Sequence, residues 1–540
     1  MNRSLRYANA TRKRPVTARA ITCALLLVLP SCQIPSLRLS EPGPGLPANY
    51  DAANNSASPN PGATSTENSS QLGIEEFYND PILSNLIVQG LVNNRELKAL
   101  DQEVQVARSE IISRQGAYLP FLSVGARAGV DKPSLFTPEG AVEKYLEYYP
   151  GAHFPDPLPN FVGSLNLFWQ LDIWRELRNA RDAAIQRYFA ASEKRNDFVT
   201  RLIAEIAENY YSLMALDKRL ETLDQIIDLQ QKSLEAAEQR LQAGRGNSLA
   251  VQRFQADVRR FQSEKLIVQQ EIVETENRVN FRVNRFPQPV ERTSAAFYDL
   301  NIHALSVGVP AQLLLSRPDI RQAERELVAA GIDIKVARAR FFPKLDLSAD
   351  VGYQSFNPKY LLMSPEALIY GVAGDLVAPL INKRAIQAEF LGANAKQLES
   401  VYNYQRVVLN AYTEVINRVA LVENYRKSIE LKKQQLEALT LAVDTSTRLF
   451  NAARVEFLEV LTTQRDLFDA RTTLIETKRQ QLVATANAYQ ALGGGGNLLP
   501  IVDPFPPRAK AHGRRWTQWF DAPAIPVVSA APAAPVVEQR

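Results

Sequence analysis

The stretch ARFFPKLDLS, residues 339–348, changes its hydrophobic pattern in the middle. Residues 320–339, which lead into it, have apolar side chains at helical spacing. From Lys344 to Val351 polar and apolar residues alternate, as in a strand with two unlike faces. Proline cannot continue helical hydrogen bonding. The pattern predicts a helix that ends at Phe341-Phe342-Pro343 and a strand that follows directly.

An earlier copy of this switch lies in GAYLPFLSV, residues 116–124. A shift of 223 positions places Tyr118 on Phe341 and Pro120 on Pro343. Further along the chain the shift falls from 223 to 209. The difference of 14 positions lies in the loop around 143–160, which is longer in the first copy. Surface loops tolerate such insertions. The chain is therefore predicted to be a duplicated unit, with a first repeat at 73–290 and a second at 291–492.

Each repeat contains a long helical run with apolar residues every seven positions. This spacing holds over 206–241 in the first repeat and over 401–450 in the second. It is typical of helices packed as coiled coils. A helix over 183–241 would be about 90 Å long. The runs stop at short breaks, 242–248 and 451–457, where a second helix returns, so each repeat is predicted to form a long antiparallel hairpin with its tip at the break.

Four segments of about ten residues show the alternation of strands. They are predicted to pair as 121–130 with 161–172 and 344–353 with 368–380. In the third segment Asp346 and Asp350 share one face, while leucine, alanine and valine occupy the other. A soluble sheet with one buried face shows the same alternation. The pattern alone leaves a soluble sheet and a membrane sheet open.

The N-terminus has the pattern of a secretion signal. A basic segment precedes the apolar run ITCALLLVLP at 21–30, which is too short to span a bilayer as a helix. The run ends at LPSC, which resembles the bacterial lipobox and predicts a signal peptide over 1–31 with lipid attached to Cys32. An ordinary cleavage site beside an incidental cysteine is the alternative. Residues 32–72 are predicted to be a lipid anchor and flexible tether, and 493–540 a disordered tail.

The net charge excludes a nucleic-acid binder. Six basic residues and no acid lie before residue 32, so removing them from the formal net charge of +4 leaves −2. A basic surface for nucleic acid is not implied.

Three features together favour strands that cross a membrane. The strands are about ten residues long, and aromatic residues lie at their ends. The lipobox-like signal has Gln33 after the cysteine where inner-membrane lipoproteins favour Asp, so it resembles an outer-membrane address. Four strands are too few to close a barrel, since about eight is the smallest number known. A barrel would therefore have to be shared between chains.

Three segments carry a resemblance to a known family: LLLSRPDIRQAERELVAA at 313–330, ARARFFPKLDLS at 337–348 and ARVEFLEVLTTQRDLFDAR at 453–471. They resemble the TolC-like outer-membrane factors of tripartite efflux pumps, in the lipoprotein branch that serves resistance-nodulation-division pumps. The resemblance covers about residues 72–492. It implies a mainly α protein with transmembrane β structure, in which a homotrimer forms one 12-stranded β-barrel continued by a periplasmic α-helical barrel. Its implied partners are a periplasmic adaptor protein, an inner-membrane pump and outer-membrane lipid.

The resemblance also implies where the working residues lie. Glu459 matches an acid at the pore constriction, where Thr462 stands in place of a second acid, and Asp346 and Asp350 would face the barrel lumen. Arg245 and Arg454 would lock the closed state through ion pairs. The family often has glycine in both hairpin tips, whereas the second tip here has Ala452-Ala453. The residues expected at the tips, in contact with the adaptor, are Gly244, Arg245, Gly246, Asn451, Ala452, Ala453 and Arg454.

No catalytic constellation is present in the sequence. His153, His303 and His512 lack metal-ligand spacing, and no phosphate-binding glycine loop follows a strand. The chain is predicted to be no enzyme, with no cofactor and no metal, and to act as a passive exit duct for small molecules such as drugs. The alternatives are a periplasmic coiled-coil scaffold or adaptor lipoprotein, and a type I secretion exit duct. A soft-metal route has no support, because methionine and histidine clusters are missing from the sequence.

Overall fold

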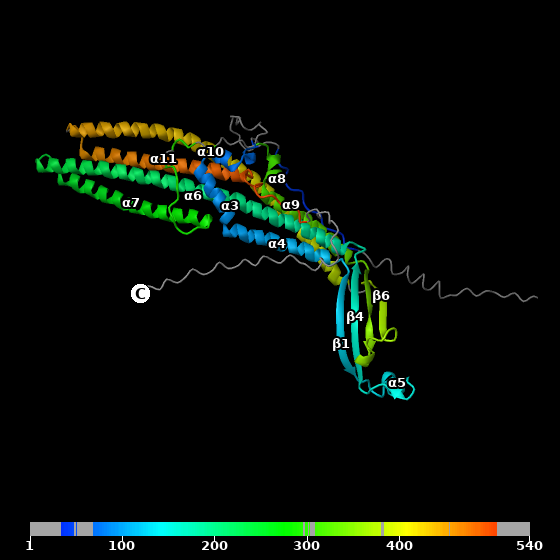
Figure 1. Cartoon of the computed structure of the whole chain (residues 1–540). Coiled ribbons are helices and arrows are strands. Elements are labelled where there is room, and N and C mark those ends of the chain that lie inside the picture. The colour runs from blue at the N-terminus through cyan, green and yellow to red at the C-terminus, as the bar shows by residue number, and fades with distance from the viewer. Residues whose placement is uncertain are drawn as a thin grey trace, which may run out of the picture. The chain divides into compact units, whose positions relative to one another are not determined.

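The computed structural model describes residues 34–47, 50, 68–294, 297–300, 302, 308–379, 383–452 and 454–504. The first repeat begins with three helices, α2 (Ile74–Tyr78), α3 (Pro81–Asn93) and α4 (Arg95–Gly116). Strands β1 (Phe121–Asp131) and β4 (Leu158–Leu171) follow, and then the hairpin of α6 (Glu176–Gln242) and α7 (Ser248–Arg282) (Figure 1). Polar side chains cap the first helices. Asp80 caps α3, whose first residue is Pro81, and Asn94 caps α4.

The second repeat has the same order of long elements: a helix, two strands and two long helices. It contains α8 (Leu313–Ser316), α9 (Pro318–Ala339), β5 (Lys344–Ser355), β6 (Leu368–Val377), α10 (Arg384–Asn451) and α11 (Phe457–Ala491). Matched helices have matched lengths: α4 and α9 have 22 residues each, α6 and α10 have 67 and 68, and α7 and α11 have 35 each. This agreement bears out the duplicated unit. A helix of 67 residues is about 100 Å long.

The four long strands form one sheet in the order β1-β4-β5-β6, and every neighbouring pair is antiparallel. The switch at Phe341 is as expected, because α9 ends at Ala339 and β5 begins at Lys344. Directly opposite residues include Leu167 and Ala349 in the central pair. Strands β1 and β6 have no partner on their outer edges among the described residues.

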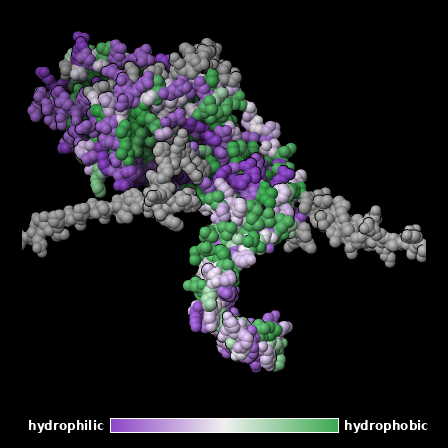
Figure 2. Space-filling model, turned by 45° about the vertical axis from the view of Figure 1, so that its right-hand side comes forward, coloured by the Kyte–Doolittle hydropathy of each residue, from purple (hydrophilic) through white to green (hydrophobic). Residues whose placement is uncertain are grey.

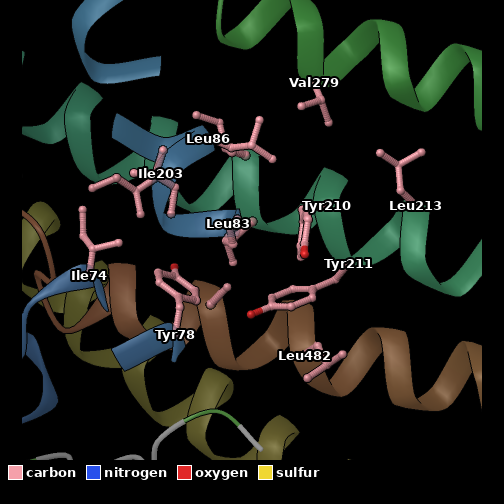
Figure 3. Packing of buried hydrophobic residues seen from close by; sticks show 14 of the residues in the cluster. Ile74, Tyr78, Leu83, Leu86, Ile203, Tyr210, Tyr211, Leu213, Val279 and Leu482 are labelled. Carbon is pink, nitrogen blue, oxygen red and sulfur yellow. The ribbon is translucent and has the colours of Figure 1, made fainter. Parts of the chain in front are cut away.

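A large apolar core joins the two repeats. It gathers residues of α2, α3, α6, α7 and α11, including Tyr78, Leu83, Tyr211 and Leu482 (Figure 3). Phe77 stacks on Tyr489 with ring centroids 4.1 Å apart. Tyr210 donates a hydrogen bond to Asp80, the N-cap of α3. These contacts fix the short N-terminal helices against the long hairpins, since buried aromatic rings contribute much of the packing energy.

The loop between β1 and β4 carries its own small elements. They are α5 (Pro138–Tyr145) and the short strands β2 (Glu147–Tyr149) and β3 (Ala152–His153). Tyr148 and Phe154 pack on Phe356, which follows β5, with ring centroids 5.0 and 5.2 Å away. The two loops at this end of the sheet are therefore held together by aromatic contacts.

The structure differs from two expectations about flexible ends. Residues 34–47, expected within a tether, are extended and bound to α10, because the Asn394 side chain hydrogen bonds to both backbone groups of Arg38. Residues 493–496, expected in a disordered tail, form buried turns. Gly493 has φ +91°, and a Cβ there would lie 2.6 Å from the Ser316 carbonyl oxygen. Glycine is thus required for close packing here, not for flexibility.

Candidate channel surfaces

One face of the sheet is polar. Because alternate side chains point to opposite faces, the register brings Asp346 and Asp350 to the same face, as expected from the sequence. Asp346 lies directly opposite Asp375 of β6 and opposite Gln170 of β4. Carboxylates directly opposite each other repel unless water screens them. Further polar residues share this face: Ser123, Arg127, Ser164, Asn166, Ser348 and Gln354.

The other face of the sheet is apolar and exposed in the single chain. Val124, Val351 and Val372 are all exposed on it. In Figure 2 hydrophobic residues gather over the upper part of the sheet, while the helical part in the same view is mostly hydrophilic. A soluble protein rarely leaves such a face uncovered. Among the described residues, no helix has the length and apolar composition needed to cross a bilayer. Exposed large residues of this face are Leu122, Val124, Val130, Leu165, Val351, Leu368, Tyr370, Val372 and Leu376.

An aromatic cluster lies where the helices join the sheet. Trp174 stacks on Phe342 with ring centroids 4.7 Å apart, and its indole nitrogen donates to the Pro343 carbonyl oxygen at 2.8 Å. Trp169 likewise donates to the carbonyl oxygen of Tyr118 at 3.1 Å. Tryptophan rings with one polar end suit a boundary between lipid and water. Both copies of the helix-to-strand switch are thus tied to tryptophans of the β4 segment.

Glu459 and Thr462 lie in the first turns of α11, and both are exposed. Glu459 is well placed for the helix, because a carboxylate in the first turn interacts favourably with the helix dipole. The Thr462 hydroxyl donates to the Leu458 carbonyl oxygen. Asp466 and Asp469 continue the same exposed stripe at spacings of four and three. The sequence argument missed these two acids, although their helical spacing from Glu459 was visible.

The two hairpin tips lie within a few residues of the expected breaks. Gly244 has φ +69°, which glycine adopts without strain, and a Cβ on Gly246 would lie 2.5 Å from the backbone nitrogen of Leu241. Arg245 and Arg454, expected to form ion pairs, are both exposed. A link between the hairpins comes instead from Arg240, which donates to the Phe450 carbonyl oxygen at 2.8 Å and stacks on the Phe450 ring.

Polar contacts also connect the hairpins further from the tips. Arg465 of α11 forms a bidentate pair with the buried Asp257 of α7. Gln464, fully buried beside it, donates to Ser233 of α6 at 3.3 Å. Gln230 of α6 is also fully buried, and neither atom of its amide has a hydrogen-bond partner among the described residues. This polar layer separates two apolar clusters, one around Phe261 and one around Phe254.

Arg317, from the RPDI segment, joins three elements of the second repeat. It pairs with Asp319 at 2.7 Å and with Glu414 of α10 at 3.0 Å, and donates to the Ala491 carbonyl oxygen at the end of α11. Burial alone would lower the pKa of Arg317, but the hydrogen bonds and charges of the two acids outweigh it and raise the pKa. Ser316 binds the next carbonyl, that of Leu492. The segment therefore caps the C-terminus of α11.

Some expected residues cannot be placed. Cys32 and Ala453 lie outside the described residues, as do the signal peptide and residues 505–540; Ala452 is described and is exposed. The side chain of Asn451 is likewise outside the description. Within the part of the chain that is described, no group of three or more His, Cys, Asp or Glu residues could hold a metal ion.

With these surfaces defined, comparison with known proteins identifies the family. Residues 86–283 and 309–494 match the family described as outer membrane efflux protein, which is more than half of the chain. The chain belongs to this family. It is an outer-membrane efflux channel, as the sequence predicted, and this function is favoured over the scaffold and secretion alternatives.

Relatives and solved structures agree with the family. The cation efflux system protein CusC of Escherichia coli K12 is 27% identical over 79% of this chain and 90% of its own length. The probable outer membrane lipoprotein SilC of Salmonella typhimurium is 23% identical over 88% of this chain and 98% of its own length. The Campylobacter jejuni CmeC outer membrane channel is 15% identical with a TM-score of 0.74, covering 86% of this chain and 94% of that one. The last likeness shows that the fold is that of an outer-membrane channel.

Proposed function

We propose that three copies of the chain close a single 12-stranded barrel through the outer membrane. The observation that carries the proposal is the sheet, which has one apolar exposed face, one polar face and two edges without a strand partner in the described part of the chain. Strand directions alternate from β1 to β6, so β6 of one copy and β1 of the next are antiparallel. Two different edges that fit each other form a head-to-tail contact, which closes into a ring. Closure also removes the exposed edges.

In this barrel the apolar face meets lipid and the polar face lines a water-filled lumen. Asp346 and Asp350 then face the lumen together with Asp375, where water screens their repulsion. Trp174 and Phe342 mark the boundary with the periplasm. The long helices continue the lumen as a periplasmic tube, because α6 and α10 follow directly from β4 and β6 along the chain.

The hairpin tips form the far end of the tube. Glu459 from each copy would form a ring of three carboxylates at the constriction, beside Thr462, and such a ring favours cations over anions. Asp466 and Asp469 extend the acidic stripe. A periplasmic adaptor would contact the tips around residues 244–246 and 451–454, and an inner-membrane pump would deliver the solute.

The chain itself would supply neither energy nor chemistry. We expect no enzymatic activity, with the transport powered by the pump. Lipid on Cys32 would anchor the chain to the membrane. Relatives at 25–27% identity are named as efflux or export proteins for cations, pyoverdine and toluene, so their names do not single out one cargo. Small molecules such as drugs are the cargo class proposed here, because selectivity in such systems would lie largely in the pump.

Single-channel conductance in a planar bilayer tests this function, with the wild type compared with Glu459→Ala and with Glu437→Ala as a control on an exposed stretch of α10. We expect long-lived conducting events in all three proteins. Cation preference should fall in Glu459→Ala only. Conductance that Glu459→Ala leaves unchanged would place the constriction elsewhere. Folded protein of trimeric mass that never conducts would refute the channel.

A further inference from the structure

The N-terminal segment 34–47, called the strap here, is bound along α10. The Arg38 backbone nitrogen donates to the Asn394 side chain at 2.8 Å, and that side chain donates to the Arg38 carbonyl oxygen. The Gln405 side chain donates to the carbonyl oxygen of Glu41. Asn394 and Gln405 are eleven residues apart, so they lie on one face of α10. The strap therefore follows one side of this helix, where residues 394 and 405 are about 17 Å apart along the axis.

The strap leaves apolar side chains uncovered. Leu39 is 91% exposed and Leu37 is 43% exposed. On α10, beside the face that binds the strap, Leu391, Tyr402 and Leu409 are exposed at spacings of eleven and seven, which place them in one stripe. The stripe lies next to the strap-binding face of α10, about 60° further around the helix. Exposed apolar surface of this kind marks an interaction site.

Exposed apolar side chains also lie on α4, at the opposite edge of the chain. Helix α4 leads into β1 through only four residues, and its apolar residues Val106 and Ile112 are exposed, Val106 by 70%. Val106 lies on the side opposite the buried Val104 and Ile111, whereas Ile112 lies about 120° away around the helix. Helix α4 has 22 residues, or about 33 Å, which is enough to run along the strap-bound part of α10.

We propose that the strap is an intersubunit contact, on which α4 of the neighbouring copy packs. This inference rests on the proposed barrel. There, β6 of one copy pairs with β1 of the next, so the helices attached to those strands, α10 and α4, meet at the same end of the seam. Leu39 of the strap then packs against Val106 of the second copy. The occupant of the apolar surface is a second copy of this chain.

Cysteine cross-linking in the full-length protein, purified in detergent, tests the contact. Leu39→Cys is combined with Val106→Cys and treated with a short bis-maleimide. We expect covalent dimers and trimers on a denaturing gel, since position 39 of one copy would lie next to position 106 of the neighbouring copy. The matched control combines Leu39→Cys with Leu362→Cys, which is an exposed leucine in the loop before β6. Each single-cysteine variant is treated in parallel, to correct for Cys32.

Native mass measured on the same samples separates this inference from the proposed barrel. A trimeric mass without cross-linked dimers of Leu39→Cys with Val106→Cys would overturn the strap contact and leave the barrel standing. A monomeric mass in folded protein would refute the barrel itself. Cross-linking of the control pair to the same extent would also count against the contact, because it would show random collision.

A second variant tests the energy of the contact without a cross-linker. Leu39→Asp should weaken trimer association by about tenfold or more, because a leucine buried between subunits is replaced by a charge, and tenfold corresponds to about 1.4 kcal/mol. Leu362→Asp should leave association unchanged. The measurement is the trimer fraction on dilution. Equal dissociation of the two variants would contradict the proposal.

Discussion

Replacing Arg317 by leucine should destabilise the junction between α9, α10 and α11. Arg317 is 8% exposed, and its guanidinium donates hydrogen bonds to Asp319, Glu414 and the Ala491 carbonyl oxygen. Leucine would leave two carboxylates without their partner, each with a side chain about a quarter exposed. Breaking a fully buried pair costs about 3–5 kcal/mol. Partial access of water to the acids reduces this figure, so we expect a loss of about 3 kcal/mol in the free energy of unfolding.

The assay is guanidinium unfolding in detergent followed by far-UV circular dichroism, together with hydrogen exchange over 488–496. Exchange should accelerate there, because the end of α11 loses its cap. Arg317→Lys keeps the charge but cannot form the planar fork, so it should recover only part of the loss. Arg426→Leu is the control, since Arg426 and Glu423 form a solvent-exposed pair on α10. An Arg317→Leu protein that unfolds at the same denaturant concentration as this control would refute the reasoning.

Two further predictions concern buried polar side chains. Gln230→Leu should stabilise the protein by about 1–2 kcal/mol, because it removes a buried amide that has no hydrogen-bond partner among the residues described. A lower melting temperature than wild type would contradict this. Gln464→Leu should gain less stability, because it loses a hydrogen bond to Ser233. Burial raises the pKa of Glu193 above its ordinary value of 4.5, although Arg321 opposes the rise. The folded state thus binds a proton on Glu193 more tightly than the unfolded state does. The melting temperature of the wild type relative to Glu193→Gln should therefore rise as the pH falls from about 7 to 4.5. Parallel pH profiles for the two proteins would show that Glu193 is not the group responsible.

The sequence by itself determined the elements that local pattern encodes. Seven-residue spacing produces long packed helices, alternation produces two-faced strands, and Phe341-Phe342-Pro343 stops a helix wherever it stands, because proline removes a backbone donor. Repetition of these patterns predicted the duplicated unit and the polar face with Asp346 and Asp350. Each of these depends on neighbours within a few positions, and so can be read along the chain.

Only the tertiary structure decided which distant residues meet. The strap has the composition of a linker, yet Asn394 and Gln405, more than 350 residues away, hydrogen bond to its backbone. The glycines at 493–496 look like a flexible tail, but they are needed because Ser316 and Tyr489 leave no room for a Cβ. Arg240 was missed at the tips for the same reason, since its partner is Phe450 of the other hairpin. Such contacts depend on the packing of segments far apart in the chain, which no local pattern records.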